Sequence, residues 1–328
     1  MNLHDRILKL KQDHSGYGHN GYLLSFSLDT CQKIDEASKN DIFAEKVVKE
    51  ILKLLKGYQV GYSEKLKSAF EVYSEYAIFH EIKSKGIAIE RVPEEKEARP
   101  DFKISLGSED IYLEAKVLGW ASGGIQHKAA IDAGIDAQID IENQLKEGKR
   151  IAISETEISP FGTSEESIEN PEQYFIEAVS TKLNRNVKPA QLKLGPTFII
   201  CDLTSLHHPI NVKSSCVIVH NDNMHESFSS GELWHIAFGE FGDRILKAIE
   251  FEGKSNVSGK LQKNGVLIEY PELIGVIFRT ATHSGECSYS CLINSEHFDK
   301  YSELITKLSD NWNDNENSNA WKLLGSNS

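Results

Sequence analysis

Two short runs of alternating apolar and polar residues, separated by a polar turn, constrain the fold of this chain more than any other feature. Phe102, Ile104 and Leu106 alternate with polar residues, and a second alternating run begins at Ile111. A period of two is typical of a half-buried strand. The four residues between the runs are polar and include a glycine, as in a hairpin turn. We therefore predict a β-hairpin within residues 99–118.

Charged side chains gather on one face of this predicted hairpin. Glu114 and Lys116 share a face because side chains repeat every second residue along a strand. Pairing of Leu106 with Ile111 across the turn would set the register. It would place Asp101 opposite Lys116 and diagonal to Glu114, at about 7–8 Å between backbones. Two carboxylates at that separation can share one ion, so the hairpin is the candidate active site.

A helix predicted just before the hairpin carries a further acid. Residues 63–85 have apolar side chains at helical spacing and are followed by Gly86, a natural stop. Glu75 falls within the apolar stripe, where a carboxylate is costly unless it is paired or bound to a cation. Glu71 lies one turn earlier in a more polar neighbourhood and is the alternative to Glu75.

The Glu-x-Lys pattern by itself has a simpler interpretation. A pair such as Glu114 and Lys116 on a strand is most often part of a solvated face with ordinary cross-strand salt bridges. Asp101, Glu75 and the order of the elements, taken together with that pair, favour a site instead.

These elements resemble the PD-(D/E)XK nuclease superfamily. The matching residues are Pro100-Asp101, Glu114-Ala115-Lys116 and the helix acid Glu75. The resemblance covers residues 63–120 closely and 172–203 loosely, where a helix and a buried strand are expected. It implies an α/β fold with a restriction-endonuclease-like core of helix, three-stranded meander, helix and strand. That core would be a mixed sheet flanked by helices, with an N-terminal helical extension and further C-terminal strands.

The resemblance also implies an activity, namely a metal-dependent endonuclease of the restriction or defence type that hydrolyses DNA. Hard oxygen ligands recruit Mg²⁺, or alternatively Mn²⁺, to a phosphodiester. Asp101, Glu114 and the Ala115 carbonyl would bind that ion, and Glu75 would complete its site or hold a metal-bound water. Lys116 would orient or deprotonate the attacking water, or stabilise the transition state.

Three residues after the hairpin are accessory candidates. Members of the superfamily often place a Lys or Gln on the helix that follows the hairpin, facing the site. Lys182, Lys188 and Gln191 match this description and would touch a phosphate or a metal-bound water. A solvated basic helix end, stabilised by the helix dipole, is an equal alternative.

One elaborated domain is the preferred organisation. The predicted segments are an N-terminal helical extension (1–62), a nuclease-like domain (63–308) with insertions at 150–171 and 205–270, and a flexible tail (309–328). Strands at 273–278 and 289–293 should extend the sheet, followed by a helix over 295–308. Residues 125–148 predict one or two helices interrupted near Gly134, and residues 232–251 predict another helix.

Composition limits the partners and the compartment. A net charge of −13 argues against nucleic-acid binding over the whole surface, although a local basic cleft is compatible with it. Five cysteines, no signal-peptide core and no apolar run of about 18–20 residues predict a cytoplasmic protein that does not span a membrane. We expect DNA as the partner, with RNA as an alternative substrate and a homodimer as one assembly.

Two rival functions stay open at this point. The first is a catalytically silent nuclease-fold protein that binds nucleic acid or a protein partner. The second is a structural or regulatory α/β protein in which the hairpin motif is coincidental.

Overall fold

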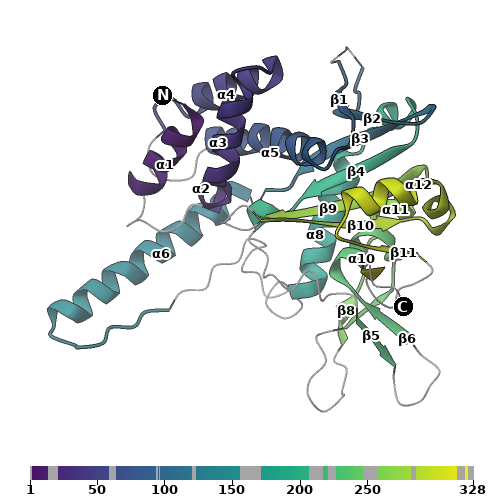
Figure 1. The fold of residues 1–328 in the computed structure, drawn as a ribbon. Helices are drawn as coiled ribbons and strands as arrows, with labels where there is room; N and C mark the ends of the chain where they lie inside the picture. The colour runs from purple at the N-terminus through teal and green to yellow at the C-terminus, as the bar shows by residue number, and fades with distance from the viewer. Residues whose placement is uncertain are drawn as a thin grey trace.

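A mixed sheet of eight strands organises the molecule (Figure 1). The computed structural model describes residues 2–13, 21–58, 64–93, 95, 97–119, 123–155, 171–206, 217–220, 227–246, 257–281, 286–315 and 322–323. The strand order is β1-β2-β3-β4-β9-β10-β11-β12. These strands are β1 Ile89–Arg91, β2 Phe102–Leu106, β3 Glu109–Val117, β4 Thr197–Asp202, β9 Leu273–Ala281, β10 Cys287–Ile293, β11 Asn311–Asp314 and β12 Lys322–Leu323.

Helices lie on both faces of the sheet. They are α1 Leu3–Asp13, α2 Gly21–Ser25, α3 Leu28–Ala37, α4 Ile42–Leu54, α5 Glu64–Ser84, α6 Gly123–Lys146, α8 Pro171–Asn186, α9 Pro189–Leu192, the 3₁₀ turn η1 Thr204–Leu206, α10 Glu232–Phe238, α11 Val266–Glu269 and α12 Ser295–Leu308. Two small hairpins complete the described elements, β5 Val217–His220 with β6 Ser227–Ser230, and β7 Arg244–Leu246 with β8 Val257–Lys260.

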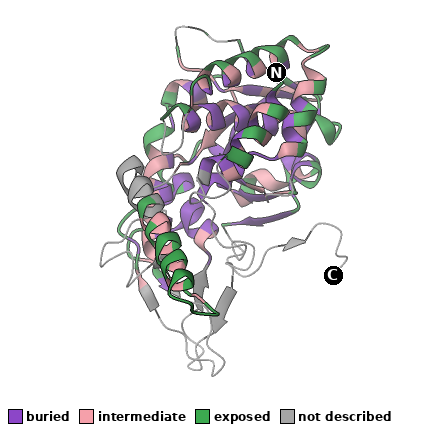
Figure 2. Cartoon of the chain, turned by 90° about the vertical axis from the view of Figure 1, so that its left-hand side faces the viewer, coloured by how far each residue is buried: buried purple, intermediate pink, exposed green. Residues whose placement is uncertain are grey.

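The two faces of the sheet have separate cores. Helices α1 to α5 and α12 share one core with Phe198 and Ile200 of β4. Helices α8, α10 and α11 share the other core with Ile199 and Cys201. Successive residues of β4 thus enter opposite cores, which explains why this strand is a nearly continuous apolar run. Figure 2 shows the strands of the sheet as mostly buried and the packed helices as carrying both buried and exposed residues.

The predicted α/β class with a mixed sheet is confirmed. Strands β1, β2 and β3 form an antiparallel meander, and β4 lies parallel to β3. The chain order is α5, β1, β2, β3, α6, α8, α9, β4. The predicted C-terminal strands also join this sheet as β9 and β10.

The flexible-tail prediction is wrong for residues 311–314, which form β11. This strand pairs in parallel with β10, with Cys291 opposite Trp312, and all four of its residues are buried. The polar composition of 309–328 suggested a solvated segment. Trp312, however, stacks on Phe298 of α12 at 3.9 Å between ring centroids, and this contact anchors the strand.

Two helices differ in length from the prediction. Helix α6 runs through Gly134 without a break, because one glycine costs a long helix only about 1 kcal/mol. Helix α10 ends at Phe238, well before residue 251. Gly242, with φ of 95°, sits in the turn that redirects the chain into β7.

Parts of the predicted insertions and tail fall outside the described residues, namely 156–170, 207–216, 221–226, 247–256, 316–321 and 324–328. Within the described part of the chain, no helix is both long and apolar enough to cross a membrane.

Candidate functional site

The β-hairpin predicted within residues 99–118 is present, but its strands pair in a different register from the predicted one. Phe102 pairs with Leu113 and Leu106 pairs with Glu109, so the turn contains only two residues. Gly107, the first of them, has φ of 63° in the left-handed region, as tight two-residue hairpin turns require. The predicted four-residue turn is therefore wrong, because this glycine lets the strands pair two residues closer to the turn.

The corrected register brings the two acids together. Continuing the observed pairing by one residue sets Asp101 opposite Glu114, where the prediction had Lys116. The backbone N–H of Ala115 donates to Asp101 Oδ2 at 2.7 Å, which fixes that carboxylate against β3. Asp101 and Glu114 are therefore direct neighbours on adjacent strands.

Glu114 is a buried carboxylate in which only one of the two oxygens has a hydrogen-bond partner among the described residues. Its side chain is 7% exposed, and Lys116 Nζ donates to its Oε1. Its Oε2 is buried and has no hydrogen-bond partner among the described residues. A buried carboxylate oxygen without a partner is costly, so this position is one where a cation would be favourable.

A negative charge on Asp101 is also unfavourable in this site. Burial raises the pKa of Asp101, and the nearby charges of Glu114 and Glu75 raise it further, to about 7. The Ala115 N–H and the Lys116 ammonium act in the opposite direction and lower that pKa, with smaller effect. Three acids therefore meet here, and the charges of two of them favour the protonated form of Asp101.

Glu75 reaches the site from α5. Its carboxylate lies 3.8 Å from Arg91 Nη2, and both side chains are partly exposed. Glu75, Arg91 and Asp101 line one pocket of about 270 Å³, together with residues 92, 93, 95 and 97–100. The structure thus brings Glu75 to Asp101.

Glu71, the alternative helix acid, lies elsewhere. Its carboxylate is 4.0 Å from Lys67 Nζ, and burial raises its pKa while Lys67 lowers it. It does not line the pocket of Asp101, and it is not among the main causes of the pKa shift of Asp101.

The three accessory candidates have three different environments. Lys182 Nζ donates to the Gly119 carbonyl at 2.8 Å, just beyond β3, and burial and the Lys67 charge lower its pKa to about 8. Gln191 is buried and donates to the Arg99 carbonyl at 3.3 Å, so it supports the chain just before Asp101. Lys188 is exposed.

A divalent cation fits this site in part. Asp101 and Glu114 supply two hard oxygen ligands. A bound cation would also give Glu114 Oε2 the partner that it lacks among the described residues. Among the described residues, no group of three or more His, Cys, Asp or Glu side chains is arranged to hold a metal. Mg²⁺ commonly takes only one or two carboxylates and fills its other positions with water and substrate oxygens, so the donor set suits that ion.

Comparison with known proteins adds no family assignment. The chain matches no protein-family model, no curated protein and no solved structure. Its function must be inferred from its own geometry.

A second polar cluster, which the sequence did not reveal, joins α5 to the sheet. Arg279 is buried and donates to both carboxylate oxygens of Glu81, at 2.8 and 2.6 Å, and to Asp202 Oδ2 at 2.7 Å. Ser74 Oγ donates to the same Asp202 oxygen, and Tyr289 OH donates to Glu81 Oε2 at 2.5 Å.

This cluster is saturated with partners, unlike the hairpin site. Asp202 also accepts from the N–H of Thr204 at 2.9 Å and from its hydroxyl at 2.5 Å. A buried arginine between two carboxylates, with every charge paired, locks elements together rather than offering a ligand site. The only signal in the sequence was an Asp and an Arg at the ends of two apolar strands, 77 residues apart.

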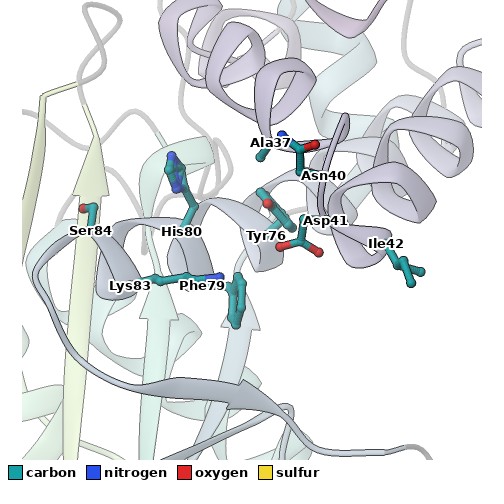
Figure 3. Close-up of a pocket in the computed structure, with 9 residues that line it drawn as sticks. All are labelled: Ala37, Asn40, Asp41, Ile42, Tyr76, Phe79, His80, Lys83 and Ser84. Carbon is teal, nitrogen blue, oxygen red and sulfur yellow. The ribbon is translucent and has the colours of Figure 1, made fainter.

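A further pocket of about 730 Å³ lies between α5 and the turn that joins α3 to α4 (Figure 3). Tyr76, Phe79 and His80 line it from α5, and Asp41 faces them from the turn. Burial lowers the pKa of His80. Among the described residues that line it, Asp41 is the one carboxylate, and it already caps α4 through the Phe43 N–H at 2.8 Å, so the described lining has no paired acids.

Proposed function

We propose that this chain is a metal-dependent endonuclease that hydrolyses DNA phosphodiester bonds, of the restriction or defence type. The observation that carries this proposal is the position of Asp101, bound to the Ala115 N–H, beside the Glu114–Lys116 ion pair, in which Glu114 is buried and keeps one carboxylate oxygen without a partner among the described residues. Such an arrangement is unfavourable in the protein alone and becomes favourable with a bound cation.

The order of the elements supports membership of the PD-(D/E)XK superfamily. A helix bearing an acid, an antiparallel meander bearing Asp101 and Glu114, and then a parallel strand β4 are the parts that the resemblance implies. This assignment is part of the proposal.

In this proposal, residues of the hairpin and of α5 have separate roles in metal binding and catalysis. Asp101 and Glu114 would hold Mg²⁺ or Mn²⁺, with the Ala115 carbonyl as a further ligand and Glu75 at the pocket side of Asp101. A metal ion in such a site polarises the phosphoryl oxygen and makes its bound water more acidic. Lys116 keeps an ammonium group against Glu114, where it can orient the attacking water and offset charge that develops on the phosphate.

A cleavage assay tests this function. Supercoiled, linear duplex and single-stranded DNA and RNA would be incubated with Mg²⁺, Mn²⁺ or EDTA. We expect metal-dependent cleavage of DNA that falls by about 100-fold or more in Asp101→Ala and in Lys116→Ala.

The same hairpin supplies matched controls. Lys103 of β2 and Asp110 of β3 form a partly exposed ion pair at 3.2 Å, and neither lines the pocket of Asp101. Asp110→Ala and Lys103→Ala should cleave like the unmodified protein. Cleavage that survives in Asp101→Ala would overturn the assignment of the site.

A catalytically silent protein that binds nucleic acid or a protein partner is the second candidate. The net charge of −13 and the lack of a three-residue ligand cluster in the described chain favour it. A shift of labelled DNA without cleavage under any metal, unchanged in Asp101→Ala and Lys116→Ala, would support this alternative.

A further inference from the structure

A pocket of about 490 Å³ lies on the α8 side of the sheet, apart from the acids. Its walls are the C-terminal part of α8, the turn after α10 and the segment 262–269. The last two belong to the predicted insertion 205–270, for which the proposed function has no role. Helices α8 and α10 share one core here, so the insertion is fixed against the nuclease-like part.

The pocket presents an exposed aromatic ring. Phe241 lines it with 68% of its surface exposed. Its backbone N–H donates to Asn264 Oδ1 at 2.9 Å, and the N–H of Gly265 donates to the Gly239 carbonyl at 2.7 Å, so both ends of this turn are tied to the facing segment. An exposed ring on a fixed backbone is a stacking platform for a base.

Two cations beside the ring lack acidic partners. Within the described chain, Arg185 forms no ion pair, and Lys263 Nζ donates only to the Thr181 hydroxyl, at 2.8 Å. Glu269, the one acid among the described lining residues, accepts from Asn264 Nδ2 at 2.9 Å. On a chain of net charge −13, these two cations are available for phosphate.

A buried acceptor completes the set. Asn184 Nδ2 donates to the Asn264 carbonyl at 3.3 Å, while Asn184 Oδ1 is buried and has no partner in the described residues. Asn184 lines the pocket, so a turn of its amide toward the cavity would let an N–H on the edge of a base satisfy this oxygen.

From these observations we infer that the pocket binds one nucleotide of a single-stranded nucleic acid. The base stacks on Phe241 with an N–H toward Asn184 Oδ1, and the flanking phosphates lie at Arg185 and Lys263. The inference rests on the proposed function, because it names where the chain holds a strand away from the hairpin acids. Lys182, one residue from Thr181 on α8, donates to the Gly119 carbonyl just beyond β3, the strand that carries Glu114.

Fluorescence anisotropy with labelled single-stranded DNA and RNA 12-mers, in EDTA so that no strand is cut, tests the inference. We expect Phe241→Ala to weaken binding by about 5- to 100-fold, whereas Phe241→Trp retains it because the larger ring still stacks. Arg185→Gln with Lys263→Gln should weaken binding and make its salt dependence shallower by about 1.4 in log–log slope.

Controls come from other exposed residues. Ile42 is 73% exposed on α4, and Lys300 and Lys307 of α12 form exposed ion pairs. Ile42→Ala and the double variant Lys300→Gln, Lys307→Gln should bind like the unmodified protein. Equal binding by Phe241→Ala, or a duplex that depends on Phe241 as strongly as a single strand, would overturn the inference.

The same preparations separate this inference from the proposed nuclease. Strand binding that requires Phe241, without cleavage under any metal, would remove the nuclease and keep the pocket. Cleavage that requires Asp101, with strand binding indifferent to Phe241, would keep the nuclease and remove the pocket.

Discussion

At the scale of single residues, the hairpin site brings acidic side chains close together, and their charges repel one another. Asp101 accepts one backbone hydrogen bond, yet its pKa is about 7 because of burial and its acidic neighbours. A carboxyl group whose folded pKa lies above its ordinary value of 3.8 keeps its proton longer in the folded state than in the unfolded state. Its contribution to stability therefore falls as the pH rises through that window.

This repulsion predicts that Asp101→Asn stabilises the metal-free protein. The amide keeps an acceptor for the Ala115 N–H, removes a charge next to Glu114 and can donate to the partnerless Glu114 Oε2. We expect a gain on the order of 1–3 kcal/mol at pH 8 and little gain at pH 4. Urea unfolding in EDTA at the two pH values measures it.

Asp110→Asn is the control, because Asp110 is exposed and already paired with Lys103. A stability gain for Asp101→Asn that is the same at both pH values would contradict the repulsion between Asp101 and Glu114.

At the scale of elements, α5 joins the site to the core. Ser74 and Glu81 of this helix bind the Asp202–Arg279 cluster, and Glu75 faces the pocket of Asp101. Removing the arginine would leave two carboxylates buried without a counter-charge, which is among the most costly changes in a protein core.

We therefore predict that Arg279→Met destabilises the fold by about 3–5 kcal/mol. Arg91→Met is the matched control, since its 3.8 Å contact with Glu75 is partly exposed, and it should cost at most about 1 kcal/mol. Chemical denaturation of both variants gives the comparison. Equal losses in the two variants would show that the buried cluster does not hold α5.

The cluster also predicts an acid response. Burial alone would raise the pKa of Glu81, but the charge of Arg279 and hydrogen bonds from Arg279, Tyr289 and Cys287 outweigh it and lower that pKa. The stability that Glu81 contributes is present above its ordinary value of 4.5 and is lost as the pH falls through its lower folded pKa. Glu81→Gln should flatten stability against pH below 4.5, and a stability curve unchanged in slope there would refute this prediction.

The hairpin turn gives a prediction for backbone geometry. Gly107 has φ of 63°, so Gly107→Ala should destabilise the protein by about 1–2 kcal/mol. Ser108→Ala in the same turn keeps the glycine and should cost less. Thermal unfolding of the two variants distinguishes them, and the reverse ranking would mean that the glycine is not what sets the register.

The helices and strands of this region could be predicted from the sequence, whereas the register in which the strands pair could not. Helix α5, the strands of the meander and α12 follow from local periodicity. The register depends on whether two or four residues make the turn, and alternation alone does not decide this. Two other features join segments that are distant in sequence, namely the Arg279–Asp202 contact and the burial of β11 against β10. Local sequence patterns cannot predict such contacts.

At the scale of the whole molecule, an acidic chain would bind nucleic acid through a small basic area. The cations proposed to meet phosphate, Arg185 and Lys263 with Lys182 nearby on α8, number far fewer than in a protein whose whole surface binds DNA.

This scarcity predicts weak salt dependence. Binding of single-stranded DNA measured between 50 and 200 mM salt should give a log–log slope of about −1.4, since each of the two phosphate contacts on a single strand contributes about −0.7. A slope several times steeper would mean that a larger basic surface exists elsewhere on the chain.

The position of α5 has a consequence for genetics. Substitutions at Ser74 or Asp202 touch neither proposed ligand, yet they loosen the helix that carries Glu75. A screen for loss of function would therefore recover them alongside Asp101 and Lys116. The amount of protein in the recovered cells would separate the two kinds of variant. Variants at Ser74 or Asp202 should have less folded protein, whereas variants at Asp101 or Lys116 should have normal amounts.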